Sequence, residues 1–262
     1  MEIVDFFRFP VTKPLESDLF NLNENELHSS LNLSDNSKVK HALIALFDSS
    51  VINKTNHVKV ISRLTHTKNF SFAYMPELSK SFGENQINAA FEMGCRSIVF
   101  HPYLQKINFQ CIDEVKRLSS FAASLGMIVS VCCAYGSRYI FQYSPLKIVV
   151  ELAEIIKTPI VIVHGGGAKV IDALLIAESF PNVYLETSFS LQYWLGSSVE
   201  KDFAFAIRKL GVERCMFGSD SPFMNIDNSI SAHLDFCKNH SFSHDEISKL
   251  MGETAKGLLG LN

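Results

Sequence analysis

Short runs of β-branched and aromatic residues alternate along the chain with longer segments in which apolar residues recur at helical spacing. This alternation is typical of repeated β-α units around a parallel sheet. The runs that we expect to form strands cover residues 2–7, 41–48, 70–75, 96–101, 127–133, 159–164, 182–187 and 213–219. The segments that we expect to form helices cover residues 52–66, 84–93, 109–125, 145–156, 168–179, 197–210, 226–239 and 243–258. Eight strands with their helices predict an α/β protein, a single (β/α)8 TIM barrel.

Glycines and capping residues agree with these boundaries. Gly94, Gly126 and Gly211 each stand just before a predicted strand, where a glycine commonly ends the preceding helix. Ser243 and Glu246 have the spacing of a capping box, which predicts the start of the last helix.

Length and composition favour one domain over residues 1–262, since 47% of the residues are hydrophobic and barrels often reach this length. The polar segment 16–37 follows the first strand, and it is either a lid over the barrel mouth or a solvated loop. A net charge of −3 without a basic run excludes a nucleic-acid binder. Without a leader or a long apolar stretch, the chain is expected to be cytoplasmic and free of membranes.

The carboxyl ends of barrel strands form the active-site mouth, so polar residues there are the first candidates for chemistry. His164 follows the apolar run 160–163 and precedes three glycines, which would leave room for a ligand beside the imidazole. Asp220 ends the eighth predicted strand. A histidine and an aspartate at one mouth form a candidate acid–base pair. Each also has a structural interpretation, as a hydrogen-bonded histidine and as a capping carboxylate.

Four segments resemble the amidohydrolase-related family of the metal-dependent hydrolase superfamily, which includes decarboxylases. They are Val163-His164-Gly165-Gly166-Gly167, residues 182–188, residues 214–223 and residues 252–261. The resemblance implies a divalent metal, usually zinc, held by an Asp-x-His-x-His motif on strand one, a histidine on strand five and the strand-eight aspartate. It also implies a small-molecule ligand, and a homodimer as in many such barrels.

This chain departs from the family pattern at the metal ligands. Strand one has Phe7 and Phe9 in place of both histidines, and phenylalanine cannot bind a metal. The cofactor is therefore either absent or a zinc ion in a rearranged site, for which the candidate ligands are His164, Asp220 and Cys132. Cys132 and Cys133 are adjacent on a strand, so only one of them can face the barrel interior.

Four further residues at strand ends are candidates for binding a substrate: Arg8, His101, Tyr135 and Glu186. Arg8 would offer a cation to an anionic ligand if it faced the mouth, but it is equally compatible with the outer face of its strand. His101 precedes a proline and either lines the pocket or belongs to a turn.

Two functions fit this residue set. The first is a hydrolase of C–N or C–O bonds, or a decarboxylase-like lyase, that acts on a small carboxylated or carbonyl compound. It would work without the usual metal centre and would use His164 and Asp220 for acid–base chemistry. The second is a catalytically inactive pseudoenzyme that binds a small ligand or a protein partner. The two phenylalanines of strand one favour the second, and the retained His164 and Asp220 favour the first.

Overall fold

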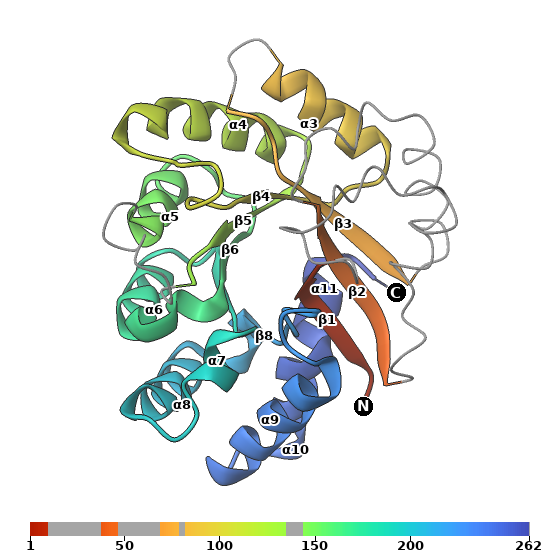
Figure 1. Cartoon of the computed structure of the whole chain (residues 1–262), viewed down its shortest axis with the longest axis vertical. Coiled ribbons are helices and arrows are strands. Elements are labelled where there is room, and N and C mark those ends of the chain that lie inside the picture. Colours follow the sequence, from red (N-terminus) through yellow and green to blue (C-terminus); the bar gives the residue numbers. More distant parts are fainter. Residues whose placement is uncertain (10–37, 47–68, 79–81, 135–143, 262) are drawn as a thin grey trace.

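The computed structural model describes residues 1–9, 38–46, 69–78, 82–134 and 144–261. Eight parallel strands follow one another around a single sheet in the order β1 to β8 (Figure 1). The strands are β1 (Ile3–Arg8), β2 (Val39–Leu46), β3 (Phe70–Tyr74), β4 (Ser97–Phe100), β5 (Ile128–Cys132), β6 (Ile160–Val163), β7 (Val183–Glu186) and β8 (Cys215–Met216). The predicted TIM barrel is confirmed, and each strand overlaps the run that predicted it.

The first and last strands meet and bring the sheet back on itself. The backbone hydrogen bonds across this seam are Phe6 N–H to Phe217 O (3.0 Å), Asp220 N–H to Phe7 O (2.9 Å) and Phe9 N–H to Ser221 O (2.7 Å). Because β8 has only two residues in its ladder with β7, most of the seam is made by the segment after β8.

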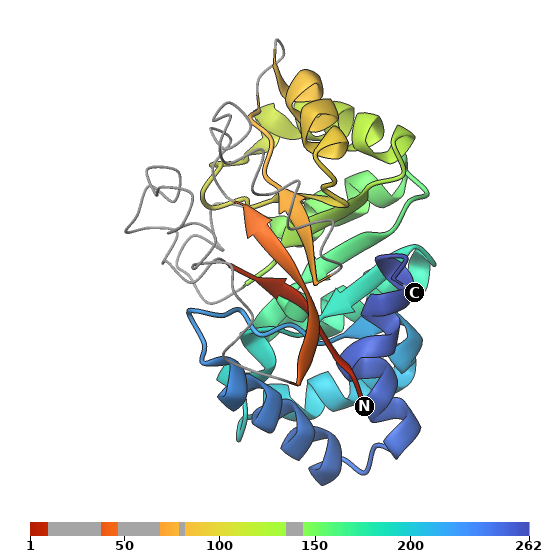
Figure 2. The same ribbon diagram turned by 90° about the vertical axis from the view of Figure 1, so that its right-hand side faces the viewer.

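The described helices lie outside the sheet, and α9, α10 (His244–Ser248) and α11 (Thr254–Leu258) lie on the side of β1 and β8 (Figures 1 and 2). The longer ones are α3 (Gly83–Glu92), α4 (Ile112–Ser124), α5 (Pro145–Ala153), α6 (Val170–Ser179), α8 (Ser198–Leu210) and α9 (Ile226–Asn239). All of these match predicted helices. The short helix α7 (Ser190–Tyr193) was not predicted, and the predicted helix 52–66 and loop 16–37 lie outside the described residues.

Side chains alternate between the barrel interior and the layer under the helices. Cys132 faces inward, since it pairs in register with the interior residue Val163, whereas Cys133 belongs to the outer apolar cluster. The register of β1 against β2 shifts between Asp5 and Arg8, which is a bulge. This bulge explains why two consecutive residues, Phe6 and Phe7, both pack in the inner cluster.

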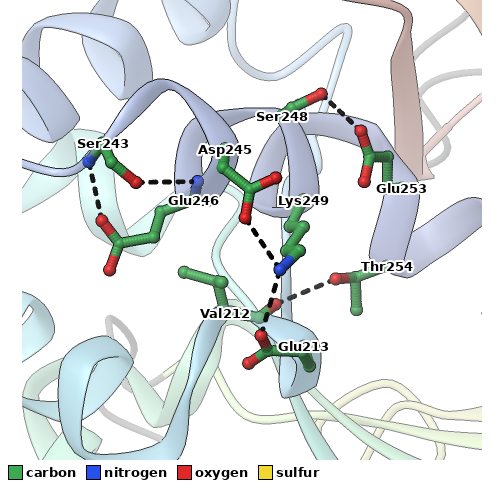
Figure 3. Close-up of polar contacts among 9 residues, drawn as sticks. All are labelled: Val212, Glu213, Ser243, Asp245, Glu246, Ser248, Lys249, Glu253 and Thr254. Atoms are coloured by element: carbon green, nitrogen blue, oxygen red, sulfur yellow. Dashed lines mark hydrogen bonds and ion pairs between the residues drawn. The ribbon is translucent and has the colours of Figure 1, made fainter.

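The last helical segment of the chain is continuous, has a π-helical turn in its middle and is tied to the turn before β8 (Figure 3). It runs through α10 (His244–Ser248), a π-helical turn (Lys249–Glu253) and α11 (Thr254–Leu258). The predicted capping box of Ser243 and Glu246 is present. Lys249 bridges Asp245 (2.8 Å) and Glu213 (3.4 Å), which anchors the π-helical turn to the turn before β8. No helix within the described ranges is long and apolar enough to cross a membrane.

Gly252, in the π-helical turn, gives a direct test of how tightly this segment packs on β1. A Cβ at Gly252 would collide with the backbone carbonyl of Glu2, whereas a Cβ at Gly257 would meet open space. We expect Gly252→Ala to lower the free energy of unfolding by about 1–3 kcal/mol through overpacking. The control Gly257→Ala is expected to keep or slightly raise it, because alanine favours helix. Urea unfolding of both variants checks this, and equal stabilities would contradict it.

Candidate active site

Among the described residues, three that are not glycine have left-handed backbone shortly after the ends of β6, β7 and β8. They are His164 (φ 64°), Phe189 (φ 53°) and Asp220 (φ 56°), which follow β6, β7 and β8. Gly165 to Gly167 continue the left-handed turn after His164. Such a conformation costs a residue with a Cβ about 1–2 kcal/mol, and strain of this kind concentrates at functional sites. His164 and Asp220 are therefore held in place by the surrounding structure.

The imidazole of His164 is oriented by Ser188. Its Nδ1 lies 2.9 Å from Ser188 Oγ and 3.2 Å from the Ser188 carbonyl oxygen. Because a carbonyl oxygen only accepts, Nδ1 carries the proton and Nε2 keeps its lone pair. Burial lowers the pKa of His164 to about 3, so the ring is neutral at physiological pH. In the described part of the chain no partner occupies Nε2, which is free to accept a hydrogen bond from a ligand.

Glu186 lies behind this histidine and is completely buried. Its carboxyl group accepts hydrogen bonds from His164 N–H (3.0 Å), Ser188 N–H (2.5 Å) and Ser188 Oγ (2.8 Å). Gly218 has no side chain because the Glu186 carboxyl occupies the space where a Cβ would be. Burial nevertheless raises the pKa of Glu186 to about 8. The Glu186 carboxyl group therefore has a structural role, because its hydrogen bonds hold the turn at His164.

Asp220 has the opposite character, since its carboxyl group is not committed to the fold. Its backbone N–H donates to Phe7 O, but its buried Oδ1 has no hydrogen-bond partner among the residues that the structure describes. The side chain is 6% exposed, at the barrel mouth. Burial raises its pKa well above the usual value, and the carboxyl groups of Glu186 and Asp5 add to the rise. A buried carboxyl oxygen without a partner is costly unless a ligand completes it.

Asp5 fixes the position of Asp220 from the other side of the seam. Its two carboxyl oxygens accept from Ser219 N–H (2.7 Å) and Ser219 Oγ–H (2.6 Å). Arg8 acts electrostatically on Asp5 and pairs in register with Ile44, whose side chain lies in the outer cluster. The register thus places Arg8 on the outer face of β1. Of the two orientations that the sequence allowed, this is the one that keeps Arg8 away from a ligand at the mouth.

Phe7 and Phe9 stand where the sequence resemblance places the two family histidines. Their rings pack edge to face at 5.5 Å, and Phe7 also packs edge to face on His164 at 5.5 Å. Among the residues that the structure describes, no three His, Cys, Asp or Glu side chains are gathered closely enough to hold a metal ion. The set His164, Asp220 and Cys132 is therefore not assembled, and these residues do not fit the family's ordinary metal centre.

The remaining candidate site residues differ in burial, and one of them lies outside the described residues. Cys132 is buried near Asp220 and Glu186, and burial raises the pKa of its thiol to about 12, which disfavours a thiolate. His101 is half-buried and close enough to His164 to influence its charge, and desolvation lowers the pKa of His101 to about 4. Tyr135 lies outside the described residues.

Sequence reasoning missed the residues that support the site. Ser188 and Ser219 gave no signal, because a serine after a strand is common. His233 on α9 is completely buried, with Nε2 2.9 Å from Thr187 Oγ1 and Nδ1 2.7 Å from the Ser229 carbonyl. Its spacing from Ile226 and Ile230 placed it on the buried face of the helix, which was a signal available in the sequence.

The barrel agrees with comparisons to known proteins. A family model described as Amidohydrolase matches residues 72–261, so the chain belongs to the amidohydrolase family. The match begins after β1, the strand that carries Phe7 and Phe9. No curated protein matches the chain.

Solved structures share the fold at low sequence identity. An uncharacterised TIM-barrel protein from Bordetella bronchiseptica has a TM-score of 0.75 at 14% identity, with 99% of each chain covered. A probable 2-pyrone-4,6-dicarboxylic acid hydrolase from Acinetobacter baumannii, with citric acid bound, has a TM-score of 0.68 at 13% identity over both whole chains. A 2,6-dihydroxybenzoate decarboxylase from Rhizobium has a TM-score of 0.64 at 13% identity, with 99% of each chain covered.

The protonation of Glu186 predicts a measurable pH dependence. Between its ordinary pKa near 4.5 and about 8 the folded chain holds a proton that the unfolded chain has lost. The free energy of unfolding therefore falls as pH rises through this window. Glu186→Gln is expected to flatten the fall between pH 6.5 and 8, although its absolute stability drops because the amide nitrogen cannot accept. Urea unfolding at several pH values checks the slope. Glu154→Gln, at an exposed position, is the control and should keep the wild-type slope.

Proposed function

We propose that this chain is an amidohydrolase-family enzyme that hydrolyses or decarboxylates a small carboxylated aromatic or carbonyl compound. His164 and Asp220 perform the acid–base chemistry, and no metal is held at the family's usual ligand positions. The observation that carries the proposal is the buried Oδ1 of Asp220, which has no partner in the described part of the chain and lies in a strained turn at the mouth. A residue kept in this state at a stability cost is best explained by a ligand.

The protonation states assign the two roles. At neutral pH the raised pKa of Asp220 favours a carboxyl group that holds its proton, and His164 is neutral with a free lone pair on Nε2. In a hydrolysis, Nε2 takes a proton from the attacking water and Asp220 donates one to the leaving oxygen or nitrogen. In a decarboxylation, Asp220 protonates the ring carbon from which CO2 departs. Both schemes rest on opposite shifts of two pKa values, since the pKa of Asp220 is raised and that of His164 is lowered.

Ring contacts across the mouth support a flat substrate. A continuous series of neighbouring rings crosses the site, with centroids 5.1–6.0 Å apart: Phe223, Phe9, Phe7, His164, Phe189 and Tyr193. Its outer members Phe223 and Tyr193 are 44% and 58% exposed, whereas Phe7 is completely buried. An aromatic compound that follows these rings inward would stack on them. The named activities of two structural relatives concern a dihydroxybenzoate and a pyrone dicarboxylate, which are flat carboxylated rings.

Turnover of such compounds is the direct test. Wild-type chain is expected to convert a member of a panel that includes 2,6-dihydroxybenzoate and 2-pyrone-4,6-dicarboxylate. Asp220→Asn and His164→Asn should each lower kcat by about 100-fold or more, the usual contribution of a positioned acid or base. Asparagine tolerates left-handed backbone, so both variants should fold. The exposed control Asp172→Asn should retain full activity.

The pseudoenzyme remains the second candidate function, because Phe7 and Phe9 pack against each other where the sequence resemblance places two metal-binding histidines. It predicts that panel compounds bind with no turnover, and that Asp220→Asn alters affinity alone. Binding measured by calorimetry beside the turnover assay separates the two functions.

Elemental analysis tests the metal-free part of the proposal. Because Phe7 and Phe9 remove two ligands, we expect the purified chain to hold far less than one equivalent of zinc, manganese or iron. Asp220→Asn and Cys132→Ser, prepared identically, are expected to give the same metal content. About one equivalent of metal that disappears in these variants would establish a rearranged site and overturn the metal-free mechanism.

A further inference from the structure

A cavity lies at the end of the barrel opposite the candidate active site. It encloses about 330 Å³ and is lined by residues at the amino ends of the strands, among them His41 of β2, Ser71 of β3 and Arg96 just before β4. Lys256 of α11 and the last residues of the chain complete the wall. The eight residues of β2 span roughly 25 Å, so this floor cavity is well separated from His164 and Asp220.

The floor cavity is positively charged in a chain that is negative as a whole. Lys40, Arg96 and Lys256 line it against one carboxylate, Glu2, while the net charge of the chain is −3. The Lys256 ammonium lies 3.9 Å from Glu2, and the Arg96 guanidinium makes one long hydrogen bond of 3.5 Å to the Cys95 carbonyl. Within the described residues, both cations therefore keep most of their donors for a ligand. A concave surface lined by one sign of charge attracts the opposite charge.

The walls are rigid and partly apolar. The backbone of Arg96 is fixed on both sides, since its N–H donates to Phe72 (3.0 Å) and its carbonyl accepts from Ile128 (3.0 Å). His41 and Ser71 are buried and hydrogen-bonded to each other at 2.9 Å. Phe70 and Leu259 add apolar surface beside the cations. This combination fits a ligand with a negative head and an apolar body.

We propose that the floor cavity binds a small organic anion, a carboxylate with an apolar body, at a site separate from the catalytic mouth. The carboxylate lies between Arg96 and Lys256, where the guanidinium can donate two parallel hydrogen bonds. The apolar body rests on Phe70 and Leu259. Because the wall joins the last residues of the chain to the starts of β2 and β3, an occupied cavity also stabilises the end of the barrel.

Titration of 4-fluorobenzoate, followed by fluorine NMR on the full chain, tests the proposal. The double variant Arg96→Gln, Lys256→Gln is expected to weaken binding at least tenfold, whereas Lys157→Gln, which removes an exposed cation elsewhere, leaves it unchanged. Neutral 4-fluorobenzamide is expected to bind far more weakly than the acid. The single variants Arg96→Gln and Lys256→Gln give the same readout if the double variant does not fold.

Asp220→Asn separates the floor cavity from the mouth. Unchanged 4-fluorobenzoate affinity in this variant, with loss in the Arg96 and Lys256 variants, supports the proposal even if the chain has no catalytic activity. Affinity lost in Asp220→Asn and kept in the double variant would place the ligand at the mouth and overturn it. Absence of binding by the wild-type chain, or equal binding of the benzamide, would overturn it as well.

Discussion

The carboxyl group of Asp5, buried between the first and last strands, is the interaction on which the geometry of the mouth depends. It accepts two hydrogen bonds from Ser219, and the next residue, Asp220, donates its N–H to Phe7. Because β8 is short, these contacts after its end hold the barrel together where β8 meets β1. They also turn the chain through the left-handed conformation that directs Asp220 into the mouth. The contacts that close the barrel are therefore the same contacts that place Asp220, the candidate acid.

Apolar packing around the mouth then sets its chemistry. Phe7 and Phe9 exclude water, so charged forms of the neighbouring groups are disfavoured. Carboxyl groups respond by holding protons, as the raised pKa of Glu186 shows, and the imidazole of His164 responds by losing one. A metal would supply positive charge to such a site, and phenylalanine cannot recruit it. The proposed acid–base pair obtains its protonation states from burial, which costs stability that the rest of the barrel provides.

The two ends of the barrel differ in electrostatic character. The carboxyl group of Asp220 and the imidazole of His164 lie at the mouth, and three cations against one carboxylate line the floor cavity. Helix α11 contributes to the floor and is positioned by the π-helical turn, where Gly252 lets the backbone approach Glu2. The packing of the last helix on β1 therefore shapes the proposed anion site, while the Asp5 seam shapes the mouth.

Hydrophobic periodicity was sufficient to predict the eight strands and most helices. Burial of the strands and of one face of each helix requires apolar residues at regular intervals along the chain. Motif order identified the family, whereas the altered metal site expected from the phenylalanines of β1 stays a prediction. Contacts between distant parts of the chain could not be predicted from the sequence. The Asp5–Ser219 seam joins residues 214 positions apart, and a bulge in β1 decides which face of the strand Arg8 occupies. The role of Ser188 and the free oxygen of Asp220 likewise depend on neighbours from other strands. Local pattern determines which elements form, whereas hydrogen-bond partners, desolvation and strain exist only once those elements pack together.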